Sequence, residues 1–148
     1  MTVNKQYFTM IQVRNALEKI ADRMAEDKWE PDVIMGINRG GCIPGIYLSH
    51  RLNKPHEALD VRLRDHKAKP DLRNLEKAYA FQKKILIIDD INDTGETLSK
   101  APGAYWATLH HKSTSKFKHN FYAREVLDQW IVYPWEREDS ETIQDYLK

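Results

Sequence analysis

The strongest constraint on the fold of this chain is the stretch ILIIDDINDTGETL at residues 85–98. Four aliphatic residues run directly into two aspartates, and a turn of small and polar residues follows. An apolar run of this kind is typical of a strand buried in a sheet. The run VIMGI at residues 33–37 has the same character, and the turn NRGG follows it. We therefore expect both runs to form buried strands.

Helical patterns separate the predicted strands. The apolar residues of 10–24 fall on one face of a predicted helix, with Thr9 as its N-cap. Residues 42–52 predict a second helix, with Pro44 in its first turn. Further strands are expected at 57–63, 105–112 and 129–133, and further helices within 72–81, after Thr94 and from Ser140. This alternation predicts an α/β fold, a single-domain, mostly parallel twisted sheet flanked by helices.

Composition limits the class of protein. A length of 148 residues suits one domain, residues 1–148, with a real core. The net charge of +1 gives no global basic field for nucleic acid, and no run reaches the roughly 20 apolar residues of a membrane helix. Cys42 is the only cysteine, which excludes a disulfide framework and favours a reducing compartment. We expect a cytoplasmic protein without a membrane or nucleic-acid partner.

The turns NRGG and DDINDTGET both follow directly after apolar strands. In parallel sheets, ligands bind beyond the carboxyl ends of the strands. A helix that begins near Thr94 would present free N–H groups to an anion, and a phosphate monoester fits Thr94, Gly95, Glu96 and Thr97. Asp89 and Asp90 point opposite ways on an extended strand and suit ribose hydroxyls or Mg²⁺. Asp93 in the turn suits proton transfer. The residues alone thus predict a sugar-phosphate site, while plain turn chemistry with Asp93 as a helix cap is the alternative.

The motif ILIIDDINDTGETL resembles the phosphoribosyl-pyrophosphate (PRPP) signature of the type I phosphoribosyltransferases. VIMGINRGGCIPGIYLSHRL is similar to the pyrophosphate loop and following helix of that family, and TLHHK and WIVYPWE look like the base-binding segments of its bacterial xanthine-guanine (hypoxanthine) branch. The resemblance covers roughly residues 33–136. It implies transfer of ribose 5-phosphate from PRPP to a 6-oxopurine (guanine, xanthine or hypoxanthine) in purine salvage, with nucleoside monophosphate and pyrophosphate as products and Mg²⁺ as cofactor.

The resemblance also implies roles for individual residues. Asp89 and Asp90 would hold the ribose hydroxyls and Mg²⁺, and Asp93 would act as acid and base toward the purine. The 5′-phosphate would lie on residues 94–97, which are Thr94, Gly95, Glu96 and Thr97. Pyrophosphate would bind at Arg39, Gly40 and Gly41. A simple left-handed turn is the alternative interpretation of NRGG.

The base would contact a hood formed mainly by residues 110–136. Lys112 would donate to the purine 6-oxo group, Trp130 would stack on the base, and the backbone of Ile131 would meet its edge. A solvated Lys and a core Trp are the ordinary alternatives. Val132 stands where the xanthine-guanine branch often has a polar residue, so the preferred purine stays open.

A basic stretch at residues 64–84 corresponds to the flexible loop of the family, placed at about 64–80. Arg73 is the candidate pyrophosphate contact, with Arg64 and Lys67 as alternatives, and a solvated charged face is the simpler interpretation. Residues 113–124 are basic and aromatic, which suggests a hairpin or an oligomer contact. The resemblance implies a homodimer or homotetramer. Two other functions stay open: a nucleotide-sensing regulator without catalysis, and a phosphoribosyltransferase for another base.

Overall fold

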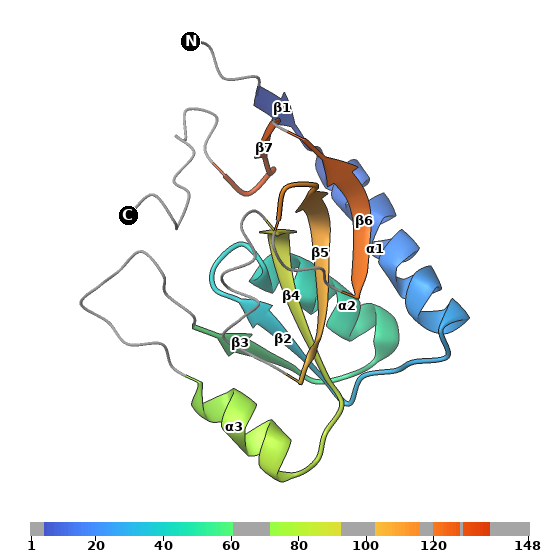
Figure 1. Cartoon of the computed structure of the whole chain (residues 1–148), viewed down its shortest axis with the longest axis vertical. Helices are drawn as coiled ribbons and strands as arrows, with labels where there is room; N and C mark the ends of the chain where they lie inside the picture. The colour runs from blue at the N-terminus through green and yellow to red at the C-terminus, as the bar shows by residue number, and fades with distance from the viewer. Residues whose placement is uncertain (1–4, 61–71, 93–102, 116–119, 128, 137–148) are drawn as a thin grey trace, which may run out of the picture.

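The computed structural model describes residues 5–60, 72–92, 103–115, 120–127 and 129–136 (Figure 1). Along these residues the elements are β1 (Lys5–Tyr7), α1 (Met10–Glu26), β2 (Val33–Ile37), α2 (Cys42–Leu52), β3 (His56–Leu59), α3 (Arg73–Ala80), β4 (Ile85–Asn92), β5 (Tyr105–Lys112), β6 (Phe121–Val126) and β7 (Trp130–Val132). The helices expected at 10–24, 42–52 and within 72–81 are confirmed. No helix in the described segments has the length and apolarity needed to cross a membrane.

The main sheet has the strand order β3-β2-β4-β5-β6, and every neighbouring pair is parallel. The predicted α/β fold with a mostly parallel sheet is therefore confirmed. The short strands β1 and β7 form a second, two-stranded parallel sheet. Figure 1 shows this small sheet beyond the carboxyl ends of β4 and β5.

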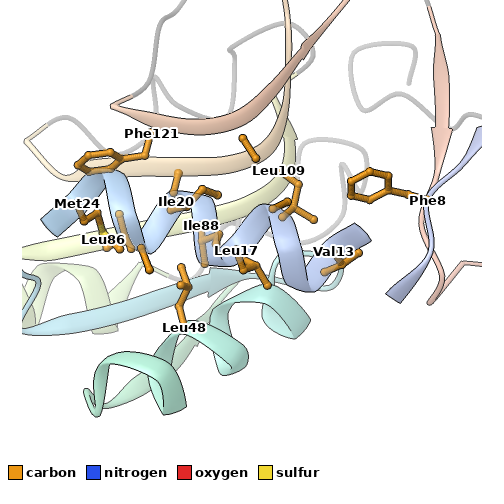
Figure 2. Close-up of a cluster of buried hydrophobic side chains, with 14 of the residues drawn as sticks. Phe8, Val13, Leu17, Ile20, Met24, Leu48, Leu86, Ile88, Leu109 and Phe121 are labelled. Atoms are coloured by element: carbon orange, nitrogen blue, oxygen red, sulfur yellow. The ribbon is translucent and has the colours of Figure 1, made fainter. Parts of the chain in front are cut away.

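The central strand β4 is buried on both faces because helices cover both. Side chains alternate along a strand, so Leu86 and Ile88 face one side while Ile85 and Ile87 face the other. The first side packs against α1 and α2, with Leu17 and Leu48 in the same cluster (Figure 2). The second side packs against α3, which contributes its only buried side chains, Leu75 and Ala78. This double cover explains the uninterrupted apolar run of the sequence.

Helix α1 begins where the sequence predicts. The Thr9 hydroxyl accepts a hydrogen bond from the Gln12 N–H at 3.1 Å, and the Gln12 side chain accepts one from the Thr9 N–H at 2.8 Å. These reciprocal bonds satisfy two N–H groups that the helix leaves unpaired. The helix then buries one face, with Val13, Leu17 and Ile20 on it. The cap and the apolar stripe together fix α1 against the sheet.

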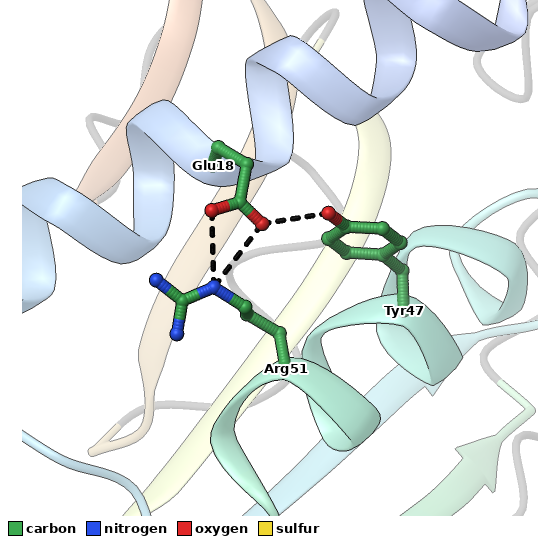
Figure 3. Close-up of polar contacts among 3 residues, drawn as sticks. All are labelled: Glu18, Tyr47 and Arg51. Atoms are coloured by element: carbon green, nitrogen blue, oxygen red, sulfur yellow. Dashed lines mark hydrogen bonds and ion pairs between the residues drawn. The ribbon is translucent and has the colours of Figure 1, made fainter.

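A polar cluster joins α1 to α2. The Tyr47 hydroxyl donates to Glu18 Oε2 at 2.6 Å, and Arg51 Nε donates to Glu18 Oε1 at 3.0 Å (Figure 3). These hydrogen bonds, first from Tyr47 and then from Arg51, lower the pKa of the Glu18 carboxyl. Because the charged groups are about half exposed, the cluster contributes little to the free energy of unfolding. Its main effect is to orient α1 and α2 relative to each other.

Three parts of the fold differ from the sequence-based expectation. The segment 113–124 is not a hairpin, because β6 runs parallel to β5 and pairs Ala107 with Phe121. Strand β1 was not predicted, and β3 begins at His56, one residue earlier than expected. Residues 61–63 of the strand expected at 57–63 lie outside the described residues. The helices expected after Thr94 and from Ser140 lie outside the described residues. Within the expected hood, 110–112 and 121–126 belong to the main sheet, and β7 belongs to the small one.

Candidate functional site

The loop after β2 and the end of β4 meet at one edge of the sheet. The pairing of β2 with β4 ends at Gly36 and Ile88, while β4 continues to Asn92. A Cβ added to Gly41 would lie 2.4 Å from the Ile88 carbonyl oxygen and 2.9 Å from Asp89 Cα. Only glycine permits so close an approach of two backbones. The structure thus brings the NRGG loop against the end of β4 that carries Asp89 and Asp90, as the sequence predicts.

Each of the two acids is held by the next residue of the chain. Asp89 Oδ1 accepts a hydrogen bond from the Asp90 N–H at 2.9 Å, and Asp90 Oδ1 accepts one from the Ile91 N–H at 2.8 Å. The second oxygen of Asp90 lies against Gly40, since a Cβ added there would be only 2.2 Å from Oδ2. The carboxylate of Asp90 is therefore fixed in direction before any ligand binds.

Asp90 has a perturbed pKa. As a residue it is half-buried, but its carboxyl lies beside Gly40 and close to the indole of Trp135. Burial raises the pKa of Asp90 to about 6, and the charge of Glu136 acts in the same direction. A hydrogen bond with the Asp89 side chain and one from the Ile91 N–H oppose this rise. A desolvated acid at a sheet edge is a typical feature of a functional site.

The loop itself places Arg39 at the surface, next to Gly40, which lies against Asp90. The peptide bond between Asn38 and Arg39 is cis, and the Asn38 side chain accepts a hydrogen bond from the Cys42 thiol at 3.1 Å. Arg39 is exposed, whereas Gly41 is buried. The loop therefore offers a cation at its tip and a close-packed backbone at its base, next to Asp89 and Asp90.

The candidate base-binding residues come from β5 and β7. Lys112 ends β5, one position beyond His111, which pairs with Asn92 of β4. Trp130 and Ile131 lie on β7, where they pair with Lys5 and Gln6 of β1. Lys5 Nζ lies 5.3 Å from the centre of the Trp130 ring, so a cation covers this indole. Ile131 is buried, and Trp130 is half-buried.

The remaining predicted residues divide into two groups. Arg73 is the first residue of α3, is exposed, and adjoins Asn74, whose side chain donates to the Ala58 carbonyl at 3.5 Å. It thus lies near the carboxyl end of β3, beside the strand that carries the loop. The others lie outside the described residues: Arg64, Lys67, Asp93, Thr94, Gly95, Glu96 and Thr97.

Two buried residues behind the acids were not predicted as site residues. Tyr133 contacts Asp90, and His110 contacts Tyr133. The Tyr133 hydroxyl donates to the backbone carbonyl of Asp90 at 3.0 Å, and His110 Nδ1 lies 2.9 Å from the same hydroxyl. Both side chains are buried. His110 and Tyr133 stand 23 positions apart, and Tyr133 stands 43 positions from Asp90, so no local pattern announces these contacts.

The structure combines a parallel sheet, paired acids at the end of its central strand and a glycine loop beside them, as the resemblance to the phosphoribosyltransferases led us to expect. Residues 4–139 match the family described as the phosphoribosyl transferase domain. The chain belongs to this family, and its fold is that of the type I phosphoribosyltransferases. The resemblance seen in the sequence is therefore confirmed.

Solved structures support the same assignment. The purine phosphoribosyltransferase from Pyrococcus horikoshii Ot3 is 32% identical over 93% of this chain and 97% of its own, with a TM-score of 0.73. The xanthine-guanine-hypoxanthine phosphoribosyltransferase of Helicobacter pylori is 17% identical over 90% and 94%, with a TM-score of 0.71. A hypothetical protein from Neisseria gonorrhoeae with bound ppGpp is 22% identical over 94% and 93%, with a TM-score of 0.73. The last two similarities support the fold alone.

Proposed function

We propose that this protein is a purine phosphoribosyltransferase that transfers the ribose 5-phosphate of PRPP to a 6-oxopurine. The observation that carries the proposal is the pair Asp89 and Asp90, held by backbone N–H groups and placed against Gly40 and Gly41. This arrangement puts acceptors for ribose hydroxyls beside a backbone that a pyrophosphate can approach closely. The 32% identity to a protein named as a purine phosphoribosyltransferase supports a purine as acceptor.

Mg²⁺ fits the donor set of this edge. Mg²⁺ prefers oxygen ligands and is usually bound by one or two carboxylates together with water and substrate phosphates. Asp89 and Asp90 would hold it in this way. In the described segments no group of three or more His, Cys, Asp or Glu residues is arranged to hold a metal without a substrate. When bound, Mg²⁺ would supply positive charge to the departing pyrophosphate.

The proposed reaction assigns a role to each of these groups. The bond between ribose C1 and a pyrophosphate oxygen breaks, while a purine nitrogen attacks C1 from the opposite face. Arg39 and the backbone of Gly40 and Gly41 stabilise the negative charge that develops on pyrophosphate. Asp93, which we propose as the acid and base, takes up the purine proton. Its replacement by Asn should lower turnover and leave PRPP binding intact.

The preference for a 6-oxopurine depends on Lys112. An ammonium group can donate a hydrogen bond to the O6 atom of guanine, xanthine or hypoxanthine. Adenine has an amino group at this position, which is also a donor, so the ammonium and amino groups would both be left unpaired. Trp130 would stack on the base, and the backbone of Ile131 would contact its edge. The position of Lys112 at the end of β5, on the edge that carries the acids, supports this role.

The test measures pyrophosphate release from PRPP and Mg²⁺ with guanine, xanthine, hypoxanthine, adenine, uracil and orotate in turn. We expect turnover with at least one 6-oxopurine and little with adenine. Asp89→Asn should lower kcat/KM for PRPP by about 10- to 100-fold, the equivalent of one charged hydrogen bond. Asp22→Asn, on the exposed side of α1, is the matched control. Absence of turnover with every base would refute the proposal.

A second pair of variants tests the base assignment. Lys112→Gln should reduce discrimination between hypoxanthine and adenine, because the amide can both donate and accept. Lys19→Gln, exposed on α1, should leave discrimination unchanged. If Lys112→Gln retained the full preference for 6-oxopurines, Lys112 would not contact O6 and another group would select the base.

A further inference from the structure

A buried hydrogen-bond chain lies behind the acids and involves residues with no assigned role. Tyr133 follows β7 directly, and its hydroxyl donates to the Asp90 carbonyl at 3.0 Å. His110 Nδ1 lies 2.9 Å from the same hydroxyl. His110 is 1% exposed and Tyr133 is 2% exposed, so water does not compete for these bonds. The chain therefore joins β5, the segment after β7 and β4 inside the protein.

The direction of each hydrogen bond follows from the chemistry of the groups. A carbonyl oxygen only accepts, so the single proton of the Tyr133 hydroxyl points to Asp90. His110 Nδ1 must then carry a proton and donate to the Tyr133 oxygen. Burial lowers the pKa of His110 to about 4, so the ring is neutral near pH 7, with its proton on Nδ1. Burial, together with the charges of Asp90 and Asp89, raises the pKa of Tyr133 and keeps its proton in place.

One peptide unit transmits this contact to the carboxylate. The peptide between Asp90 and Ile91 accepts from Tyr133 through its carbonyl and donates from its N–H to Asp90 Oδ1 at 2.8 Å. A peptide unit is planar, so fixing the carbonyl also fixes the N–H on its other side. The direction of the Asp90 carboxylate, with Oδ2 against Gly40, is thereby linked to the Tyr133 hydroxyl.

The tyrosine is itself held on several sides. Its ring stacks on that of Trp135, with centroids 5.0 Å apart and planes 1° apart. Phe8 presents its edge to Tyr133 and to His110, at centroid distances of 6.2 Å and 4.6 Å. The Tyr133 N–H donates to Glu136 Oε1 at 2.9 Å. Such packing leaves the hydroxyl little freedom, as a group that orients another group requires.

We propose that Tyr133 and His110 are positioning residues for PRPP binding, which hold the Asp90 carboxylate in its productive direction through the peptide between Asp90 and Ile91. The inference rests on the proposed function, because it assigns to Asp90 a contact with PRPP. Tyr133 also follows the candidate base-binding residues Trp130 and Ile131, so one side chain links the purine strand to the PRPP acid.

The first variant is Tyr133→Phe, which removes the hydroxyl and keeps the stacked ring. We expect kcat/KM for PRPP to fall by about 10-fold, the equivalent of one hydrogen bond. Tyr105→Phe, at the opposite end of β5, is the matched control and should leave kcat/KM unchanged. His110→Asn keeps an N–H near the position of Nδ1 and should preserve PRPP affinity, whereas His110→Leu should lower it as Tyr133→Phe does.

A double-mutant cycle separates positioning from general destabilisation. If Tyr133 acts through Asp90, Tyr133→Phe should have little further effect on PRPP binding in an Asp90→Asn background. The positioning role would be overturned if Tyr133→Phe lowered PRPP binding equally in the wild-type and Asp90→Asn backgrounds, or if it left the PRPP kinetics unchanged. In either case, turnover by the wild-type enzyme would still support the proposed function. Absence of wild-type turnover and of PRPP binding would overturn both.

Discussion

The variant Gly40→Ala tests the geometry of the acid pair directly. The added methyl carbon would lie 2.2 Å from Asp90 Oδ2 and 3.4 Å from Trp135 Nε1. The second contact is ordinary, but the first requires the carboxylate oxygen to move by about 1 Å to reach a normal separation. Gly40 does not have a positive φ, so the backbone accepts alanine and the strain falls on the Asp90 side chain.

Displacement of the carboxylate has a cost that can be worked from its contacts. Rotation away from Gly40 weakens the 2.8 Å bond from the Ile91 N–H, and hydrogen bonds to charged groups contribute about 1.5–3 kcal/mol. This range corresponds to about 10- to 100-fold in binding. A displacement of 1 Å at a reacting centre can lower a rate by about 100-fold. We therefore expect PRPP affinity in the presence of Mg²⁺ to fall by about 10- to 100-fold.

The assay is isothermal titration calorimetry with PRPP and Mg²⁺, together with thermal unfolding of the same samples. Gly40→Ala should melt within a few degrees of the wild type. Gly45→Ala in α2 is the control, because its methyl group would meet His56 Nε2 at 2.7 Å and Ile88 Cγ2 at 3.1 Å, and we assign neither side chain to the PRPP site. PRPP affinity of Gly40→Ala equal to that of the wild type would refute the assignment of Asp90 to the PRPP site.

The other predictions concern the core, a buried titrating group and the base. Leu17→Ala, in the cluster beneath α1, should lower the free energy of unfolding by about 2–5 kcal/mol in urea titrations. The folded-state pKa of His110, about 4, lies below its usual 6.5 because of burial and the charge of Arg124. Between pH 4 and pH 6.5 the unfolded state therefore binds more protons than the folded state. The resulting contribution to the free energy of unfolding, roughly 3 kcal/mol, is fully present above pH 6.5 and is lost as the pH falls toward 4. Urea titrations at pH 7.5, 6 and 5 should show the wild type losing its advantage over His110→Asn as the pH falls, and parallel curves would contradict this. Trp130→Ala should raise KM for the purine by about 10-fold in initial-rate assays, more than KM for PRPP, as loss of base stacking predicts.

Local signals were enough to predict the elements of the main sheet that carry the acids. VIMGI and YWATLHHK form strands with the predicted bounds, and CIPGIYLSHRL forms α2 from Cys42 to Leu52. Thr9 caps α1 because a cap depends only on residues within one turn. The meeting of NRGG with the acids also followed, since parallel strands joined by crossovers bring their carboxyl ends to one edge.

Contacts between distant segments escaped prediction. Strand β6 buries Phe121, Ala123 and Val126, but the neighbouring Arg124 and Glu125 are exposed and hide the pattern. Strand β1 has three residues, none of them buried, and exists through its pairing with β7. Neither strand has a run of apolar residues long enough to show in the sequence. Tertiary pairing supplies what the local pattern lacks.

The same need for partners connects the end of β4 to its function. Pairing with β2 stops at Ile88 while pairing with β5 continues to Asn92, so some backbone groups beyond Ile88 require other partners wherever water is excluded. The Asp90 and Ile91 N–H groups donate to the carboxylates of Asp89 and Asp90, and the Asp90 carbonyl accepts from Tyr133. Each bond that satisfies the backbone also fixes the direction of a carboxylate. Because β4 extends beyond its pairing with β2, one set of contacts both satisfies the backbone at its end and orients the carboxylates of Asp89 and Asp90.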